Sequence, residues 1–185
     1  MSERRKRLTG SLRPMGSQDL ELVLGWRNHP EVRRWMYTTH EIGLDEHRTW
    51  FAGASEDPRK HLLVYEVEGV PAGFVNLTVD VPDSNGPTVA VWGFYLAPDA
   101  PRGCGRGLGS AAIAHAFREL GVDLLLAEAL GTNANSIAFH RRLGFADAGP
   151  RDEPHRPEDG GEVVDVLCFR LERAAWAAEQ EGATR

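Results

Sequence analysis

Residues 92–109 read WGFYLAPDAPRGCGRGLG, and this stretch decides the fold. It begins inside an apolar run, Val89–Leu96, whose β-branched and aromatic residues predict a buried strand that two prolines then end. A turn rich in glycine follows, and from Leu108 apolar residues recur with the spacing of an amphipathic helix. Such a turn presents backbone N–H groups beside the positive end of the helix dipole. The stretch therefore predicts a strand, a phosphate-binding turn and a helix.

The spacing of the glycines distinguishes between the kinds of phosphate-binding turn. A P-loop requires Gly-x-x-x-x-Gly-Lys followed by Ser or Thr, and the sequence has no such string. The dinucleotide fingerprint Gly-x-Gly-x-x-Gly also fails, because its last glycine would fall on Leu108 or Ser110. The pattern that remains is Arg102-x-x-Gly105-x-Gly107.

The length and charge of the chain indicate one globular domain. Its 185 residues suffice for a substantial core, and the order of predicted elements indicates one mixed α/β domain over residues 8–171. We expect residues 1–7 to form a solvated basic end rather than a secretory signal, and residues 172–185 a terminal helix and tail. A formal net charge of −6 argues against nucleic acid as the main partner. No apolar run approaches the roughly 20 residues of a membrane span.

The cysteines and histidines of the sequence indicate whether disulfides or a metal site are to be expected. Cys104 and Cys168 are the only cysteines, one in the glycine-rich turn and one in an apolar strand. We therefore expect no disulfide framework and a protein of the reducing cytoplasm. The seven histidines form no His-x-x-x-His pair and no cluster with carboxylates at ligand spacing, so we expect no metal.

Other parts of the chain predict further strands and helices. Strands are predicted at 8–14, 61–67, 72–79, 124–130 and 163–171, with a hairpin turn at Glu68-Gly69. Helices are predicted at 18–26 with Ser17 as N-cap, in a short segment capped by Asn28, from Asp45 through Phe51, at 136–143 and at 172–180. Gly144 is expected to end the helix before it, and residues 148–161 to form a surface loop.

A second motif follows the central helix after one intervening strand. It reads Asn133-x-x-Ser136-x-x-Phe139-His140-x-x-Leu143-Gly144-Phe145. Together with Arg102-x-x-Gly105-x-Gly107, it resembles the signatures of the GNAT acetyltransferases. The resemblance implies a GNAT fold, an α/β domain whose mixed central sheet has about six to seven strands, flanked by helices and splayed at its centre. It also implies acetyl-CoA as the co-substrate from which an amine takes the acetyl group.

Two strings in the N-terminal half narrow this resemblance. They are Trp26-Arg27-Asn28-x-Pro30-Glu31-Val32-Arg33-x-Trp35-Met36 and Glu41-Ile42-x-Leu44-x-Glu46-His47. With GFYLAPDAPRGCG at residues 93–105, they look like the pseudaminic-acid pathway branch, whose enzymes acetylate the 4-amino group of a UDP-linked 4-amino-4,6-dideoxy sugar. RimJ/RimL-like acetyltransferases of protein N-termini share the second motif and are the alternative. A non-catalytic acyl-CoA-binding domain is an alternative of another class, and a homodimer is left open.

The resemblance implies that acetyl-CoA, the acetyl donor, binds to residues of the stretch 92–109 and of the second motif. Strand residues Phe94, Tyr95 and Leu96 would pair with the pantetheine arm through their backbone. The amides and arginines of the turn would hold the pyrophosphate; these residues are Arg102, Gly103, Cys104, Gly105, Arg106, Gly107, Leu108 and Gly109. Asn133 would bind the pantetheine arm or fix its own loop, and Ser136 lies beside it in the motif.

Aromatic and guanidinium groups near residue 30 suit a sugar ring and a diphosphate. The acceptor residues that we expect are Trp26, Arg27, Asn28, Arg33, Met36, Tyr37 and Trp92. The alternative for this stretch is that its tryptophans are core residues and its arginines are solvated.

Catalysis needs a base for the amine and an acid for the leaving thiolate. GNAT members often carry a carboxylate on the central strand, but Val89–Leu96 has none, so the base candidates are Glu128, His40, Glu41 or a chain of water. Where the family often has a tyrosine acid, this chain has His140, whose imidazole titrates at about 6.5 and can do the same work. On this reasoning, His140→Ala lowers kcat at least about tenfold and leaves acetyl-CoA binding intact.

Overall fold

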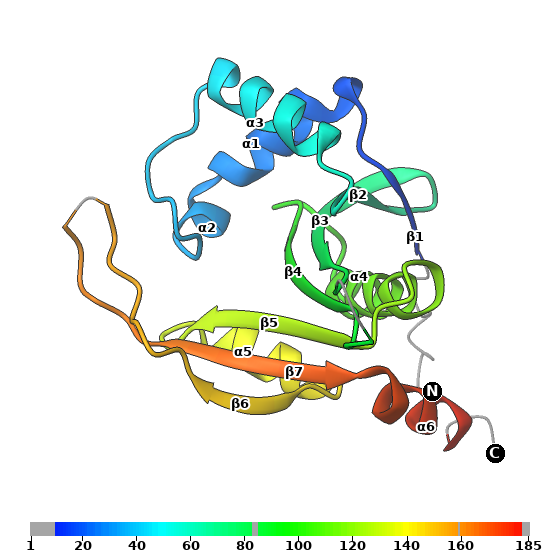
Figure 1. The fold of residues 1–185 in the computed structure, drawn as a ribbon. Coiled ribbons are helices and arrows are strands. Elements are labelled where there is room, and N and C mark those ends of the chain that lie inside the picture. The colour runs from blue at the N-terminus through cyan, green and yellow to red at the C-terminus, as the bar shows by residue number, and fades with distance from the viewer. Residues whose placement is uncertain (1–9, 83–84, 159, 183–185) are drawn as a thin grey trace, which may run out of the picture.

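The computed structural model describes residues 10–82, 85–158 and 160–182, and these form an α/β domain around one mixed sheet (Figure 1). Within them the sheet has seven strands in the order β1-β2-β3-β4-β5-β7-β6. The strands are β1 (Gly10–Pro14), β2 (Lys60–Val67), β3 (Val70–Asp80), β4 (Val89–Leu96), β5 (Leu124–Leu130), β6 (Ala146–Pro150) and β7 (Val166–Glu172). The helices are α1 (Leu20–Asn28), α2 (Pro30–Arg33), α3 (Leu44–Glu56), α4 (Cys104–Ala114), α5 (Ala134–Arg142) and α6 (Arg173–Gly182). The expected mixed sheet flanked by helices is confirmed.

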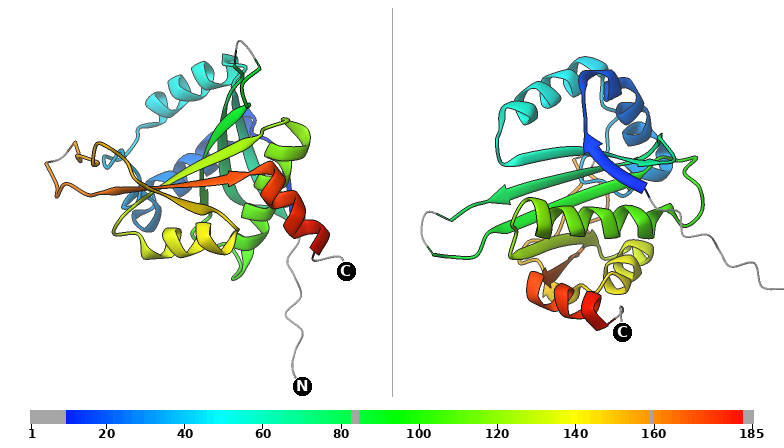
Figure 2. Two further views of the ribbon diagram at one scale, coloured as in Figure 1. Left: turned by 60° about the horizontal axis from the view of Figure 1, so that its bottom comes forward. Right: turned by 90° about the vertical axis from the view of Figure 1, so that its right-hand side faces the viewer.

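The helices pack on both faces of the sheet (Figure 2). Strand side chains alternate between the two faces, so Leu62 and Val64 of β2 join the core under α1 and α3, whereas Leu63 and Tyr65 join the core under α4. The first core also takes Trp26 from α1. Burial on both faces explains why β2 and β3 have nearly continuous apolar sequences.

Helix α4 follows the apolar stripe predicted for it. Leu108, Ala112 and Ala116 are fully buried, and a π-helical turn over His115–Glu119 ends the segment. The helix approaches β3 closely because Gly73 has no side chain. A Cβ at Gly73 would lie 2.6 Å from Cδ1 of Leu108. This packing sets the position of the start of α4 relative to the end of β4.

The two central strands diverge. β4 pairs with β3 along its whole length, but it pairs with β5 in parallel only at residues 89–91. Beyond this point β5 continues beside β7 and turns away from β4 (Figure 1). No strand of the described residues pairs with that edge of residues 92–96. The structure therefore confirms the splayed central strands, and it leaves backbone hydrogen-bonding groups of β4 free inside the molecule.

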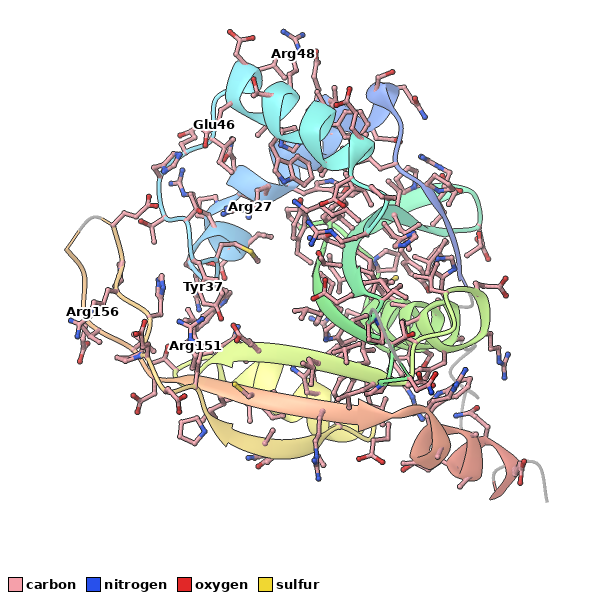
Figure 3. The ribbon with its side chains drawn as sticks, in the orientation of Figure 1. Arg27, Tyr37, Glu46, Arg48, Arg151 and Arg156 are labelled. Atoms are coloured by element: carbon pink, nitrogen blue, oxygen red, sulfur yellow. The ribbon has the colours of Figure 1, made fainter. Side chains whose placement is uncertain are left out.

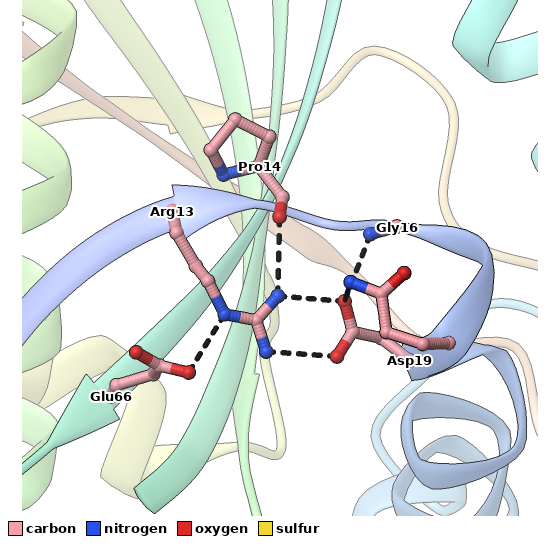
Figure 4. A network of polar contacts seen from close by, with 6 residues as sticks. Arg13, Pro14, Gly16, Asp19 and Glu66 are labelled. Atoms are coloured by element: carbon pink, nitrogen blue, oxygen red, sulfur yellow. Dashed lines mark hydrogen bonds and ion pairs between the residues drawn. The ribbon is translucent and has the colours of Figure 1, made fainter. Parts of the chain in front are cut away.

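A buried ion pair anchors the chain between β1 and α1 (Figure 4). Asp19 is 4% exposed, and its two carboxylate oxygens accept hydrogen bonds of 2.7 and 2.8 Å from the guanidinium of Arg13. Arg13 also donates to Glu66 of β2 at 2.7 Å. The hydrogen bonds from Arg13 hold the pKa of Asp19 below its usual value. The backbone amide of Gly16 donates to Asp19 as well, at 2.8 Å.

Three helix caps differ from the sequence predictions. Ser17 is not a cap but the first residue of a 3₁₀ turn that leads into α1. Asn28 ends α1, and its side chain bonds both backbone groups of Ile42, while His29 caps α2. Helix α3 begins after Gly43 rather than at Asp45. The side-chain carboxamide of Asn28 makes both of its hydrogen bonds with the backbone of Ile42, so it is not available to cap α2.

The C-terminal part is more ordered than predicted. Residues 148–161 were expected to form a loop, but Ala146–Pro150 forms the edge strand β6 beside β7. The chain then runs out and back as an arm, residues 151–165, which a bridge between His155 and Val164 holds together. Gly144 ends α5 with a φ of +90°, as expected, and the predicted hairpin turn is confirmed by the positive φ of Glu68 and Gly69. No helix among the described residues is long and apolar enough to span a membrane.

Candidate active site

A cleft of about 660 Å³ lies where β4 and β5 diverge. Residues 91–96 of β4 line one wall and residues 128–130 of β5 the other. Side chains from α5 close one side, and α2 with the residues after it closes the opposite side. Gly105, in the first turn of α4, also lines the cleft. The cleft therefore joins the start of α4 to the segment that follows α2.

The start of α4 has the features that the sequence predicted for a phosphate site. Gly103 occupies the N-cap with a φ of +94°, a conformation that favours glycine. The first amides of a helix have no acceptor within the helix. Cys104 uses its amide to bond back to the preceding turn at 3.1 Å, which leaves the amides of Gly105 and Arg106 for a ligand. The side chains of Arg102 and Arg106 are exposed at the same end.

Three residues assigned to this phosphate site also serve packing. Cys104 and Leu108 are fully buried, and burial raises the pKa of the Cys104 thiol. Gly109 lies in the second turn of α4, where amides bond within the helix. A Cβ at Gly109 would lie 2.6 Å from Cδ1 of Leu143 on the segment after α5. This part of the glycine-rich run therefore lets α4 and α5 pack closely, and the assignment of these three residues to the pyrophosphate stays a prediction.

The second motif builds the side of the cleft formed by α5. Asn133 is the N-cap of α5, and its Oδ1 accepts the amide of Ser136 at 3.0 Å. Asn133, Ser136 and Phe139 all line the cleft. Of the two roles expected for Asn133, this hydrogen bond supports the fixing of its own loop.

His140 is 1% exposed, and both of its ring nitrogens are hydrogen-bonded. Nδ1 donates to the carbonyl of Ser136 at 2.8 Å, and Nε2 accepts from Nε1 of Trp92 at 3.2 Å. The ring also stacks on Phe169 at 4.9 Å. Burial lowers the pKa of His140, so the ring is neutral at pH 7. The acid role stays a prediction, but this geometry favours a structural role, because neither nitrogen carries a free proton.

Glu128 reaches the cleft from β5, and side chains from two distant segments meet it there. Tyr37, after α2, donates to its Oε2 at 2.5 Å, and Arg151 of the arm contacts the same oxygen at 3.3 Å. The ring of His155 lies 4.9 Å from the ring of Tyr37. Figure 3 shows Tyr37 and Arg151 side by side above the end of β5. Sequence reasoning missed Arg151 and His155, since nothing local in the arm marks them.

The structure separates the predicted acceptor residues into two groups. Met36, Tyr37 and Trp92 line the cleft. Trp26 is 7% exposed in the core, and the side chain of Asn28 is fully used by Ile42, so the acceptor assignment of these two is corrected. Arg33 does not line the cleft and contacts Glu41 at 3.5 Å. Trp35, which was not assigned, does line the cleft, and the guanidinium of Arg34 lies 4.6 Å from the centre of its ring.

The remaining base candidates do not line the cleft. Glu41 faces solvent with its Arg33 partner. His40 is exposed between Glu46 and Glu158, whose hydrogen bonds raise its pKa. Of the side chains proposed as base, Glu128 alone is among the described residues that line the cleft.

A buried arginine lies at the end of α1 (Figure 3). Arg27 is 9% exposed; its Nη2 donates to the carbonyl of Thr38 at 2.9 Å, while its Nη1 has no partner among the described residues. His47 of α3 is 4% exposed, and its Nε2 also lacks a partner among them. Burial lowers the pKa of both groups, and the charge of Arg27 lowers that of His47 further. Tyr95, a residue of the cleft wall, lies close enough to interact with the charge of Arg27.

Comparison with known proteins identifies the family. Residues 10–146 match the acetyltransferase (GNAT) domain. The chain belongs to the GNAT acetyltransferase family. The protein is accordingly an N-acetyltransferase that uses acetyl-CoA as co-substrate. Among the described residues, no group of three or more His, Cys, Asp or Glu side chains could hold a metal ion.

Individual relatives agree with this membership. The chain is 29% identical over 134 residues to the acetyltransferase PseH of Campylobacter jejuni, a match that covers 71% of this chain and 79% of the relative. A spermidine N-acetyltransferase from Vibrio cholerae has the same fold with a TM-score of 0.80 at 17% identity, over 91% of this chain and 98% of that one. The aminoglycoside acetyltransferase AAC(6')-Ib follows with a TM-score of 0.76 at 18% identity, over 93% and 99%.

Proposed function

We propose that the protein acetylates the 4-amino group of a UDP-linked 4-amino-4,6-dideoxy sugar in the cytoplasm, as a step in the synthesis of pseudaminic acid or a related nonulosonic acid. The similarity to PseH and the motifs of the N-terminal half support this acceptor. The observation that carries it is the buried guanidinium of Arg27, close to Tyr95 of the cleft wall, whose Nη1 has no partner among the described residues. A buried guanidinium nitrogen without an acceptor is costly, and a phosphate oxygen of the acceptor's diphosphate would supply one to Nη1, while Nη2 stays bonded to Thr38.

The proposed binding mode of acetyl-CoA rests on the family membership of the chain and on the geometry at the start of α4. The free amides of Gly105 and Arg106 would hold the pyrophosphate of acetyl-CoA, with the guanidiniums of Arg102 and Arg106 beside it. The free edge of β4 would bond the pantetheine arm, because its backbone groups at residues 94–96 have no strand partner on that side. Acetyl-CoA supplies the activated acetyl group, and these contacts direct the thioester toward the divergence of β4 and β5.

The chemistry requires that the acceptor amine loses a proton and attacks the thioester carbon. Amines of this kind are largely protonated near neutral pH, so a base raises the fraction that can attack. We propose Glu128 as that base, since its carboxylate faces the cleft. The nitrogen of the tetrahedral intermediate loses its second proton to solvent water as the C–S bond breaks, and the CoA thiolate leaves and takes up a proton from solvent water.

A protein N-terminus is the competing acceptor. Two contacts close the acceptor side against an extended peptide: the ring of Tyr37 meets that of His155, and His40 meets Glu158 at 3.4 Å across the same gap. Both join the segment after α2 to the arm. A small sugar ring fits beneath such a bridge more readily than a peptide chain, which supports the nucleotide sugar. A homodimer stays a prediction.

Release of CoA thiol with a panel of UDP-4-amino sugars and N-terminal peptides tests the acceptor. We expect the sugar nucleotide to give the higher kcat/KM. Arg27→Met should raise KM for the sugar nucleotide roughly 10-fold to 100-fold, the size of a lost hydrogen-bonded charge, with KM for acetyl-CoA unchanged. Arg48→Met is the matched control, because Arg48 lies on the outer side of α3 (Figure 3). A higher kcat/KM for a peptide would overturn the proposal.

A further inference from the structure

Glu128 is held by one oxygen only. The hydroxyl of Tyr37 and the guanidinium of Arg151 both contact Oε2, at 2.5 and 3.3 Å. No hydrogen bond among the described residues reaches Oε1 of the same carboxylate. A glutamate side chain on the cleft side of a strand would otherwise sample several rotamers. Two contacts at a single oxygen restrict the side chain and leave the second oxygen open to the cleft, which Glu128 lines.

The two contacts come from opposite ends of the domain. Tyr37 belongs to the segment after α2 and lies 91 positions before Glu128, whereas Arg151 begins the arm after β6. The guanidinium of Arg151 also lies 5.5 Å from the centre of the Tyr37 ring, and His155 packs against that ring. The arm therefore orients Tyr37 as well as Glu128. Three segments have to fold together before the carboxylate is placed.

Tyr37 is suited to act as a permanent donor. Burial and the neighbouring carboxylate both raise the pKa of Tyr37 well above its usual value, so its hydroxyl keeps the proton at any pH at which the protein works. Hydrogen bonds to a charged acceptor are short and strong. The hydroxyl therefore fixes Oε2 without competing for the proton that the reaction moves.

We propose that Tyr37 and Arg151 are positioning residues that hold Oε2 of Glu128, so that Oε1 faces the acceptor amine and accepts its proton. Tyr37 then acts through Glu128 and not by binding the sugar. The inference rests on the proposed function in that the acceptor is an amine and Glu128 is its base; it does not depend on which amine it is. The competing explanation is that Tyr37 and Arg151 simply fasten the arm to the rest of the fold.

A double-mutant cycle separates these explanations. Glu128→Gln should lower kcat about 100-fold or more, as expected for loss of a general base. Tyr37→Phe keeps the ring but removes the hydroxyl, and it should lower kcat about tenfold through misplacement of the base, with KM for acetyl-CoA unchanged. In the Glu128→Gln background, Tyr37→Phe should change kcat by less than about twofold, because there is no base left to position. Thermal unfolding of each variant shows that it is folded at the assay temperature.

Substitutions in the arm complete the test. Arg151→Met should lower kcat by a similar factor, and Arg151→Lys should restore most of it, since the ammonium keeps a charged donor near Oε2. Arg156→Met is the matched control on the same arm, where the side chain is exposed and points away from the cleft (Figure 3); it should leave kcat unchanged.

An equal effect of Tyr37→Phe in both backgrounds would overturn the proposal, as would wild-type kcat in Tyr37→Phe. If the UDP-amino sugar is not acetylated, the cycle is run with whichever amine of the panel is, so a wrong acceptor leaves the positioning test intact. A chain that acetylates none of the amines would overturn both proposals.

Discussion

Replacement of His140 tests the role that the structure favours for this residue. In His140→Ala the N–H of Trp92, a residue 5% exposed, loses its acceptor, and the space between Phe169 and Phe145 is left empty. A buried donor without a partner costs about 1–3 kcal/mol. The cavity left by the imidazole adds about 2 kcal/mol. We therefore expect a loss of about 4 kcal/mol in the free energy of unfolding.

The loss can be measured by calorimetry. For a chain of this size each kcal/mol shifts the melting temperature by about 2–4 °C, so Tm should fall by roughly 10 °C. His140→Gln is the informative companion, because its carboxamide can accept from Trp92 but cannot titrate. We expect His140→Gln to recover part of the stability.

Kinetics then separate structure from catalysis. Well below the melting temperature, CoA thiol release by His140→Gln should stay within about threefold of wild type, since general acid catalysis would be worth 10²–10⁴-fold. A fall of tenfold or more in kcat, with Tm and acetyl-CoA binding retained, would refute this reasoning. It would show that the ring turns away from Trp92 and protonates the thiolate, as the sequence motif predicts.

Three further outcomes are expected. Asp19→Asn should lower the free energy of unfolding by about 2 kcal/mol in urea denaturation, because Arg13 loses one of its two charged partners and keeps Glu66. Because the pKa of Asp19 is lowered in the folded protein, its wild-type contribution is present above about pH 3.8 and is lost as the pH falls below that value. Gly103→Ala places a side chain at a φ of +94°; it should cost about 1 kcal/mol and weaken acetyl-CoA binding in titration calorimetry, and unchanged binding would contradict the phosphate site. The pKa values of His47 and His140 are lower in the folded protein than in the unfolded chain, so the unfolded chain takes up protons first as the pH falls. The contribution of these two groups to the free energy of unfolding is therefore complete above about pH 6.5. Below that pH it falls by up to about 1.4 kcal/mol per pH unit for each group. Urea titrations at several pH values check this slope, which should be smaller in His47→Gln.

The donor side could be predicted from sequence because its signals are local. A buried strand, a glycine with positive φ and the first amides of a helix are adjacent in the chain, and neighbouring residues determine their geometry. The same holds for Asn133, whose side chain caps the helix that it begins. The limit of such reasoning is visible at Gly109, where a glycine of the run serves contact with Leu143, a residue that no local pattern identifies as its neighbour.

The acceptor side could not be predicted in the same way. Trp26 and Trp35 look alike in sequence, yet the first is core and the second lines the cleft, because the chain changes direction between α1 and α2. His140 of α5 stands where a family acid is expected, but its Nε2 accepts a hydrogen bond from Trp92 of β4, a strand distant in the sequence.

The sequence alone therefore determined an α/β domain and a phosphate-binding turn, since both depend on backbone preferences within about twenty residues, and resemblance to a family added acetyl-CoA. Only the tertiary structure decided which side chains meet at the acceptor. Among the described residues, Glu128 is a carboxylate hydrogen-bonded at one oxygen only, because Tyr37 and Arg151 reach that oxygen from segments far apart in the chain. Contacts of that kind form because the splayed sheet brings the segment after α2 and the arm together. The spacing of residues along the chain cannot predict them.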